Sequence, residues 1–168
     1  MKTELHYSSK VSWVPYDHDI QIFAVDGELD IDEDLITTVF CIGYESPKMN
    51  ESLLLVKDKD RGWNTPGGHR IPGETLEETL RREVWEESRC KILQHEPIGY
   101  QKLTLLEDPG PDYKYPSPVS YQLFYECLVK PEKFEPSDET TDRIFVNPVD
   151  LFKMDDINPD LCFALVRV

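Results

Sequence analysis

The segment from residue 75 to residue 88 constrains the fold more than any other part of this sequence. Thr75 and Glu78 have the spacing of a capping box, in which each side chain bonds to the other residue's backbone N–H at the start of a helix. Apolar residues then recur at helical spacing until the pattern fails near Ser88. These apolar residues are Leu76, Leu80 and Val84. We therefore predict a helix that turns this stripe toward a protein core.

Three glutamates break the expected pattern of this helix. Glu83 follows Leu76 by nearly two helical turns, and Glu87 follows Leu80 by the same interval, so both acids fall on the apolar stripe. Glu86 borders the stripe. Like charges three or four residues apart on a helix repel by about a few tenths of a kcal/mol per pair, and by more when they are desolvated. Acids on a core-facing stripe violate binary patterning, as is typical of functional sites.

A bound cation would relieve this repulsion, so a divalent metal site is the first hypothesis. Oxygen ligands on a rigid helix suit Mg²⁺ or Mn²⁺, which keep several waters and bridge to phosphate oxygens. The alternative is an exposed acidic helix face that pairs with neighbouring arginines. The arginines available for it are Arg81, Arg82 and Arg89. Glycines at 67–68 and at Gly73 favour the metal site, because they allow the backbone to approach a metal or phosphate closely.

The segment 68–90 resembles the Nudix box, G-x5-E-x7-R-E-U-x-E-E-x-G-U, where U is an apolar residue. The matching positions are Gly68, Glu74, Arg82, Glu83, Val84, Glu86 and Glu87. Arg89 stands where the family has its second glycine, and Ile71 stands where many members have a glutamate. Neither departure removes an expected metal ligand, although arginine adopts the left-handed conformation at a helix end less readily than glycine.

The resemblance implies an α/β protein with the Nudix fold, an α/β/α sandwich with a central mixed β-sheet. It implies an enzyme, a hydrolase that cleaves a pyrophosphate bond in a nucleoside diphosphate linked to another group. Glu83, Glu86, Glu87 and the carbonyl of Gly67 would hold Mg²⁺ or Mn²⁺. Arg82 and Glu74 would pair to hold the helix against its loop. The proton acceptor would be Glu83 or Glu139, because family members differ, and Glu83 is preferred.

The substrate is a small nucleotide whose class the box leaves open: a nucleoside triphosphate, an NDP-sugar or a dinucleotide. The alternative function is a catalytically silent Nudix domain that binds or senses a nucleotide. His69, Tyr113 and Lys114 are candidate substrate-binding residues, with Tyr115 beside them, because aromatic rings stack on bases and cations meet phosphates. The alternative for each is an ordinary loop side chain without function.

The chain length suits a single domain over residues 1–168, with residues 1–33 as an N-terminal appendage that holds one strand. Residues 67–68 are expected to form a loop. The predicted strands are 20–25, 36–44, 52–56, 61–66, 98–106, 120–129 and 143–146, with a short helix at 147–152 and a final helix that opens at Asn158. Trp63 is expected in the core. Trp85 is expected to be buried within the monomer, or alternatively under a second subunit of a homodimer.

Charge and composition narrow the classes of partner. The formal net charge of −15 argues against long nucleic acid, whose affinity depends on Lys and Arg at phosphates. No apolar run approaches the roughly 20 residues that span a bilayer, so we expect no membrane partner and a cytoplasmic location. The cysteines are far apart, without zinc-site spacing, and are expected to be free core thiols. They are Cys41, Cys90, Cys127 and Cys162.

Overall fold

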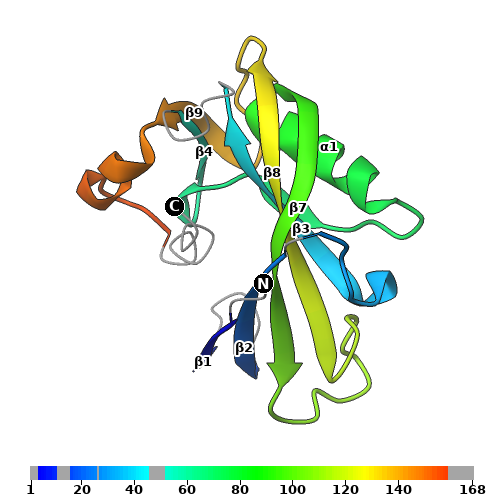
Figure 1. Cartoon of the computed structure of the whole chain (residues 1–168). Helices are drawn as coiled ribbons and strands as arrows, with labels where there is room; N and C mark the ends of the chain where they lie inside the picture. The colour runs from blue at the N-terminus through cyan, green and yellow to red at the C-terminus, as the bar shows by residue number, and fades with distance from the viewer. Residues whose placement is uncertain (1–3, 11–15, 26, 46–51, 159–168) are drawn as a thin grey trace.

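A computed structural model describes residues 4–10, 16–25, 27–45 and 52–158. The strands, in chain order, are β1 (Glu4–Lys10), β2 (Asp17–Ala24), β3 (Ile36–Tyr44), β4 (Leu53–Asp58), β5 (Gly62–Asn64), β6 (Gly67–His69), β7 (Cys90–Leu105), β8 (Val119–Pro131) and β9 (Thr140–Val146). The helices are the 3₁₀ turn η1 (Glu33–Leu35), the α-helix α1 (Leu76–Ser88) and the 3₁₀ turn η2 (Pro148–Lys153). Figure 1 shows α1 lying beside the strands.

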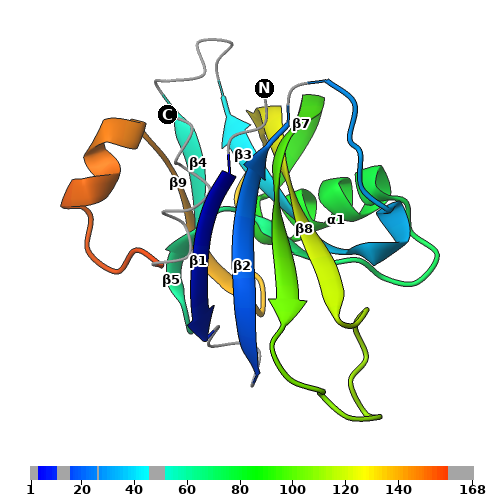
Figure 2. The same ribbon diagram turned by 60° about the horizontal axis from the view of Figure 1, so that its bottom comes forward.

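All nine strands form one mixed sheet in the order β1-β2-β7-β8-β3-β4-β5, with β6 added to β3 and β9 added to β4. The long β7 and β8 form an antiparallel ribbon, and β8 runs parallel to β3. Figure 2 shows β1 and β2 side by side next to this ribbon. Among the described residues, β3 and β4 pair only at Tyr44 and Leu53, because β6 occupies much of the remaining edge of β3.

Most predicted strands are confirmed, with two corrections in the first half of the chain. The expected single strand before residue 33 is wrong, because β1 pairs with β2 along seven residues of its length. The expected loop at 67–68 is also wrong, because these residues form β6 against β3. A Cβ atom on Gly67 would lie 2.3 Å from the carbonyl oxygen of Val39, so glycine is what allows this close strand pairing. The predicted final helix falls on residues outside the described part of the chain.

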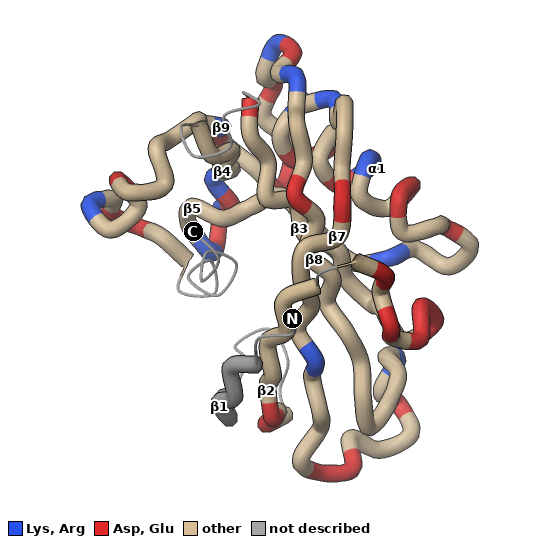
Figure 3. The backbone as a smooth tube through the Cα atoms, in the orientation of Figure 1, with Lys and Arg blue, Asp and Glu red and all other residues tan. Residues whose placement is uncertain are grey.

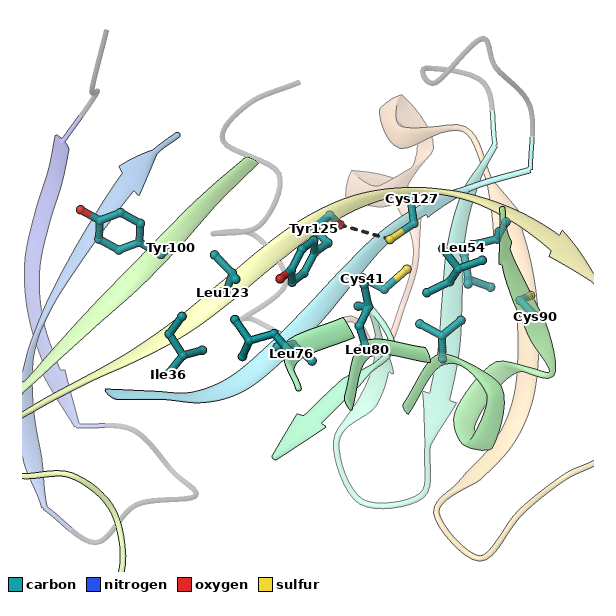
Figure 4. Close-up of a cluster of buried hydrophobic side chains, with 14 of the residues drawn as sticks. Ile36, Cys41, Leu54, Leu76, Leu80, Cys90, Tyr100, Leu123, Tyr125 and Cys127 are labelled. Atoms are coloured by element: carbon teal, nitrogen blue, oxygen red, sulfur yellow. Dashed lines mark hydrogen bonds between the residues drawn. The ribbon is translucent and has the colours of Figure 1, made fainter. Parts of the chain in front are cut away.

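The main core lies between α1 and the sheet, as Figure 4 shows. Leu80 and Val84 of α1 are fully buried against Cys41, Leu123 and other sheet residues. Burying such a side chain contributes about 1.5 to 3 kcal/mol, so the apolar stripe fixes the orientation of the helix. A second core cluster lies around β4, and the partly buried Trp63 packs against it, as expected of a core residue.

Cys41, Cys90 and Cys127 are buried free thiols, as predicted, whereas Cys162 lies outside the described residues. The neighbouring Cys127 side chain, followed by burial, raises the pKa of the Cys41 thiol. Figure 3 shows that acidic residues are spread over loops, strands and helix, in keeping with the net charge. Within the part of the chain that the structure describes, no helix is long and apolar enough to cross a membrane.

Both ends of α1 are capped by nearby or packed side chains and by a suitable backbone conformation. At the start, Thr75 accepts the N–H of Glu78 at 3.1 Å and its own N–H donates to the Glu78 carboxylate at 2.8 Å, which confirms the capping box. At the end, Arg89 adopts the left-handed conformation with φ 54°. The arginine thus takes the backbone conformation that the family's glycine would supply. Arg143 donates to the carbonyl of Ser88 at 2.7 Å and so satisfies a free acceptor at this helix end.

The expected burial of Trp85 within the monomer is wrong, whereas its burial under a second subunit stays a prediction. Its side chain is 41% exposed on the outer face of α1, opposite the core stripe. The guanidinium of Arg89 lies 5.5 Å from the ring centroid in a cation–π arrangement. No strand that the structure describes packs there, and the N-terminal strand β2 pairs with β7 while β1 pairs with β2.

Candidate functional site

Two of the three box glutamates lie inside the protein. Glu83 and Glu87 are only 7% and 6% exposed, on the side of α1 that faces the sheet. The backbone N–H of Gly67 donates to Glu87 Oε2 at 2.9 Å. A Cβ atom on Gly68 would lie 2.6 Å from the carboxyl carbon of Glu83. Strand β6 therefore lies directly against both carboxylates, and its glycines are what make this contact close.

Burial disfavours the charged form of these two acids. It raises the pKa of Glu87 to about 8, although the N–H of Gly67 opposes the shift. The neighbouring carboxylates of Glu83 and Glu139 add to the increase, and Arg61 reduces it. Burial also raises the pKa of Glu83, against the opposing effect of Arg82. The helix therefore holds two carboxylates that repel each other in a place where water cannot stabilise them fully.

Arg82 is the central cation of the box. It binds Glu74 through two parallel hydrogen bonds, from Nε to Oε1 at 2.7 Å and from Nη2 to Oε2 at 2.9 Å. It also donates to the His69 carbonyl at 3.1 Å and contacts Glu83 at 2.6 Å. The Arg82 guanidinium holds the pKa of Glu74 at about 2. Since Glu74 lies in the loop and Arg82 in the helix, the structure brings these two residues together in the way that was expected.

Glu86 stands apart from the other two glutamates. Its side chain is 56% exposed and lies 3.3 Å from Arg82 Nη1. Among the residues that the structure describes, no three His, Cys, Asp or Glu side chains are gathered closely enough to hold a metal ion. Glu83 and Glu87 are thus positioned together, and Glu86 would have to turn from Arg82 to join them.

The loop before β9 adds a further carboxylate. Thr140 donates its hydroxyl to the backbone carbonyl of Glu87 at 2.8 Å, which fixes the start of β9 against α1. Glu139, the preceding residue, is exposed, and its charge raises the pKa of both Glu83 and Glu87. The second candidate for the proton acceptor is therefore close enough to the box to interact with it electrostatically.

The candidate substrate-binding residues meet through aromatic contacts. His69, at the end of β6, stacks on Tyr115 with ring centroids 5.1 Å apart and an interplanar angle of 24°. Lys114 Nζ lies 5.9 Å from the Tyr115 centroid, and Tyr113 packs edge-on against Tyr115 at 5.7 Å. Burial, followed by the charges of Lys114 and Arg61, lowers the pKa of His69. The proline-rich loop between β7 and β8 is thereby held against the box.

Arg61 is the residue near the site that the sequence did not indicate. It lies in the turn between β4 and β5, and its charge interacts with Glu87 and Glu139. A single arginine in the charged segment 57–61 matches no motif, so only its position in space indicates a role.

A family model for the NUDIX domain matches residues 35–163. The chain belongs to the Nudix family. The mixed sheet with few helices is the Nudix fold. Members of this family are mostly enzymes and typically depend on a divalent metal ion.

Solved structures of Nudix proteins share this fold. The Bacillus subtilis pyrophosphohydrolase BsRppH superimposes with a TM-score of 0.61 at 21% identity, over 90% of this chain and 85% of that one. A MutT Nudix hydrolase from Burkholderia pseudomallei gives 0.55 at 20% identity, over 77% and 96%. The Nudix domain of Shewanella oneidensis NrtR, solved with ADP ribose, gives 0.53 at 17% identity, over 79% and 88%. At these identities the likeness concerns the fold alone.

Proposed function

We propose that this Nudix domain is a divalent-metal-dependent hydrolase that cleaves a pyrophosphate bond in a nucleoside diphosphate derivative. The observation that carries the proposal is the burial of Glu83 and Glu87 against the backbone of β6. Two adjacent carboxylates with raised pKa values destabilise a metal-free helix, and a divalent cation would stabilise their charged forms.

The donor set fits Mg²⁺ or Mn²⁺. Glu83, Glu86, Glu87 and the carbonyl of Gly67 are all oxygen donors, which hard divalent cations prefer. Glu86 is solvent-exposed and bound to Arg82 by one contact of 3.3 Å, so its side chain is free to turn toward the other two. When bound, the metal would neutralise the diphosphate and lower the pKa of the attacking water.

The protein's own residues would position the reaction. Arg82 and Glu74 keep the loop fixed on the helix, so the backbone of β6 and the carboxylates of α1 stay in register. Glu83 is the preferred proton acceptor because it lies in the box beside Gly68, and Glu139 is the alternative from the loop before β9.

His69, Tyr113 and Lys114 are proposed to contact the rest of the substrate. The aromatic rings of the loop offer a stacking surface for a nucleobase, and Lys114 supplies a positive charge for a phosphate. The substrate is a small nucleotide: a nucleoside triphosphate, an NDP-sugar or a dinucleotide.

A substrate panel would test the proposal. Purified protein is incubated with nucleoside triphosphates, NDP-sugars and dinucleotides in Mg²⁺ or Mn²⁺, and phosphate release is read after coupling to a pyrophosphatase or phosphatase. We expect hydrolysis of at least one class, and its loss in the Glu87→Gln variant. No hydrolysis of any compound, with the same metal affinity in Glu87→Gln as in the wild type, would contradict the proposal. Tight nucleotide binding without product, measured by calorimetry, would instead support the nucleotide-sensing alternative.

A further inference from the structure

Arg61 has no part in the metal-binding arrangement proposed above, yet it lies next to it. Two hydrogen bonds, one from a backbone N–H and one from a side-chain hydroxyl, connect its turn to the box helix. The N–H of Lys59, in the same turn, donates to the carbonyl of Glu139 at 3.1 Å. The hydroxyl of Thr140, which follows Glu139, donates to the carbonyl of Glu87 at 2.8 Å. The turn between β4 and β5, the loop before β9 and α1 are therefore adjacent.

Asp58 fixes the direction of the Arg61 side chain. Its Oδ2 accepts hydrogen bonds from Arg61 Nε at 3.1 Å and Nη2 at 2.6 Å. Its Oδ1 accepts the backbone N–H groups of Asp60 at 2.8 Å and Arg61 at 2.9 Å. The Asp58 side chain is only 12% exposed. One carboxylate thus closes the turn and holds the guanidinium, which greatly reduces its freedom to rotate.

The other edge of the guanidinium remains available. Within the described part of the chain, Arg61 forms an ion pair with Asp58 and with no other acid, and Nη1 has no hydrogen-bond partner. The side chain is 47% exposed, so a ligand can reach it. Its charge nevertheless interacts with Glu87, Glu139 and His69. Arg61 therefore presents donors beside the site without neutralising the carboxylates that would hold the metal.

We propose that Arg61, oriented by Asp58, binds a phosphate oxygen of the substrate. The inference rests on the function proposed above and adds a substrate-binding residue to it. A planar guanidinium with two edges suits this role, because one edge can stay on Asp58 while the other donates to a phosphate. Asp58 is then a positioning residue, which acts through Arg61.

Two binding measurements separate a phosphate contact from a structural effect. The first calorimetric titration measures the affinity for Mn²⁺ without a phosphate ligand. The second measures the affinity for imidodiphosphate in the presence of Mg²⁺; this ligand cannot be hydrolysed at its P–N–P bridge. We expect Arg61→Ala to weaken imidodiphosphate binding by about 10- to 100-fold, the effect of losing a hydrogen bond between charged groups. Mn²⁺ binding should be unchanged or tighter, because a cation near the carboxylates has been removed.

Matched variants complete the test. Arg81→Ala removes an arginine that pairs with Glu77 on the outer face of α1, and should leave both affinities as in the wild type. Arg61→Lys should lose less imidodiphosphate affinity than Arg61→Ala, and Asp58→Asn should lose about 3- to 10-fold with normal Mn²⁺ binding.

Two results would overturn the inference: equal losses of Mn²⁺ and imidodiphosphate affinity in Arg61→Ala, or an imidodiphosphate affinity equal to that of Arg81→Ala. A wild-type protein that binds neither Mn²⁺ nor imidodiphosphate would overturn the proposed function itself.

Discussion

Replacing Glu87 by glutamine is expected to stabilise the metal-free protein. Burial raises the pKa of Glu87 to about 8, whereas the ordinary value for a glutamate is 4.5. Between these values the folded state binds more protons than the unfolded state, so the free energy of unfolding falls as pH rises. Glutamine keeps an oxygen that can accept the N–H of Gly67 and has no charge to desolvate.

The two pKa values give the size of the effect. By linkage, the raised pKa of the Glu87 carboxyl lowers the free energy of unfolding by about 1 kcal/mol at pH 5 and by about 3 kcal/mol at pH 7. The advantage of Glu87→Gln over the wild type should therefore grow by about 2 kcal/mol across this range, and level off above pH 8, where Glu87 is ionised in both states. Glu86→Gln is the control, since its exposed side chain should change stability by less than about 0.5 kcal/mol.

Urea unfolding in EDTA at pH 5, 6, 7 and 8 measures these differences, and added Mn²⁺ should cancel most of the advantage of Glu87→Gln at pH 7. A ligand present at 100 times its dissociation constant stabilises the folded state by about 2.7 kcal/mol, which the wild type should gain and Glu87→Gln should largely lose. The reasoning fails if Glu87→Gln in EDTA is no more stable than the wild type at pH 7, or if its advantage does not depend on pH.

Three further substitutions test other parts of the box. Arg89→Gly should raise the free energy of unfolding by about 1 kcal/mol in thermal or urea unfolding, because glycine adopts the left-handed conformation at this helix end without steric cost. Arg89→Ala should not raise it, because alanine keeps the Cβ atom. Gly68→Ala should change stability by about 1 kcal/mol or less because the Glu83 side chain can move aside, but the displaced carboxylate should weaken Mn²⁺ binding measured by calorimetry. Glu74→Gln should cost about 1 to 2 kcal/mol at pH 7 by urea unfolding, because it removes the charge from the two-bond pair with Arg82. The pKa of Glu74 is about 2, so this difference should be complete above about pH 4.5 and shrink as pH falls toward 2; a difference that grows in acid would contradict the assignment.

Local sequence signals predicted the helix and its two inward acids correctly. The capping box, the apolar stripe and the positions of Glu83 and Glu87 all depend on residues within two or three helical turns of each other. The Arg82–Glu74 pair was implied by the resemblance to the Nudix box, and the structure contains it. Such features can be predicted from the sequence because neighbouring residues decide them.

Features that depend on distant strands could not be predicted in this way. Strand β6 forms because β3 offers an edge to Gly67 and Gly68, and no periodicity in three residues signals that pairing. Trp85 is exposed because β2 pairs with β7 and not with the helix. Arg61 comes close to the site through the pairing of β4 with β9, which joins residues more than eighty positions apart.

The expected position of Glu86 is the part of the site that the sequence left unresolved. Spacing placed it at the border of the core stripe, and in the structure Arg82 holds it outside. The orientation of a side chain at such a border depends on which partner it contacts, and here Glu86 contacts Arg82, one turn earlier on the same helix. Its role as a metal ligand stays a prediction.

The arrangement of the site has a consequence for how such a protein diverges. The proposed metal ligands come from one stretch, 67–87, whereas most of the proposed substrate contacts come from the turn at 58–62 and the loop at 107–118. A single inherited segment can therefore preserve the reaction while separate loops drift and acquire new ligand preferences. This separation makes the loops the place where selection for a different ligand would act.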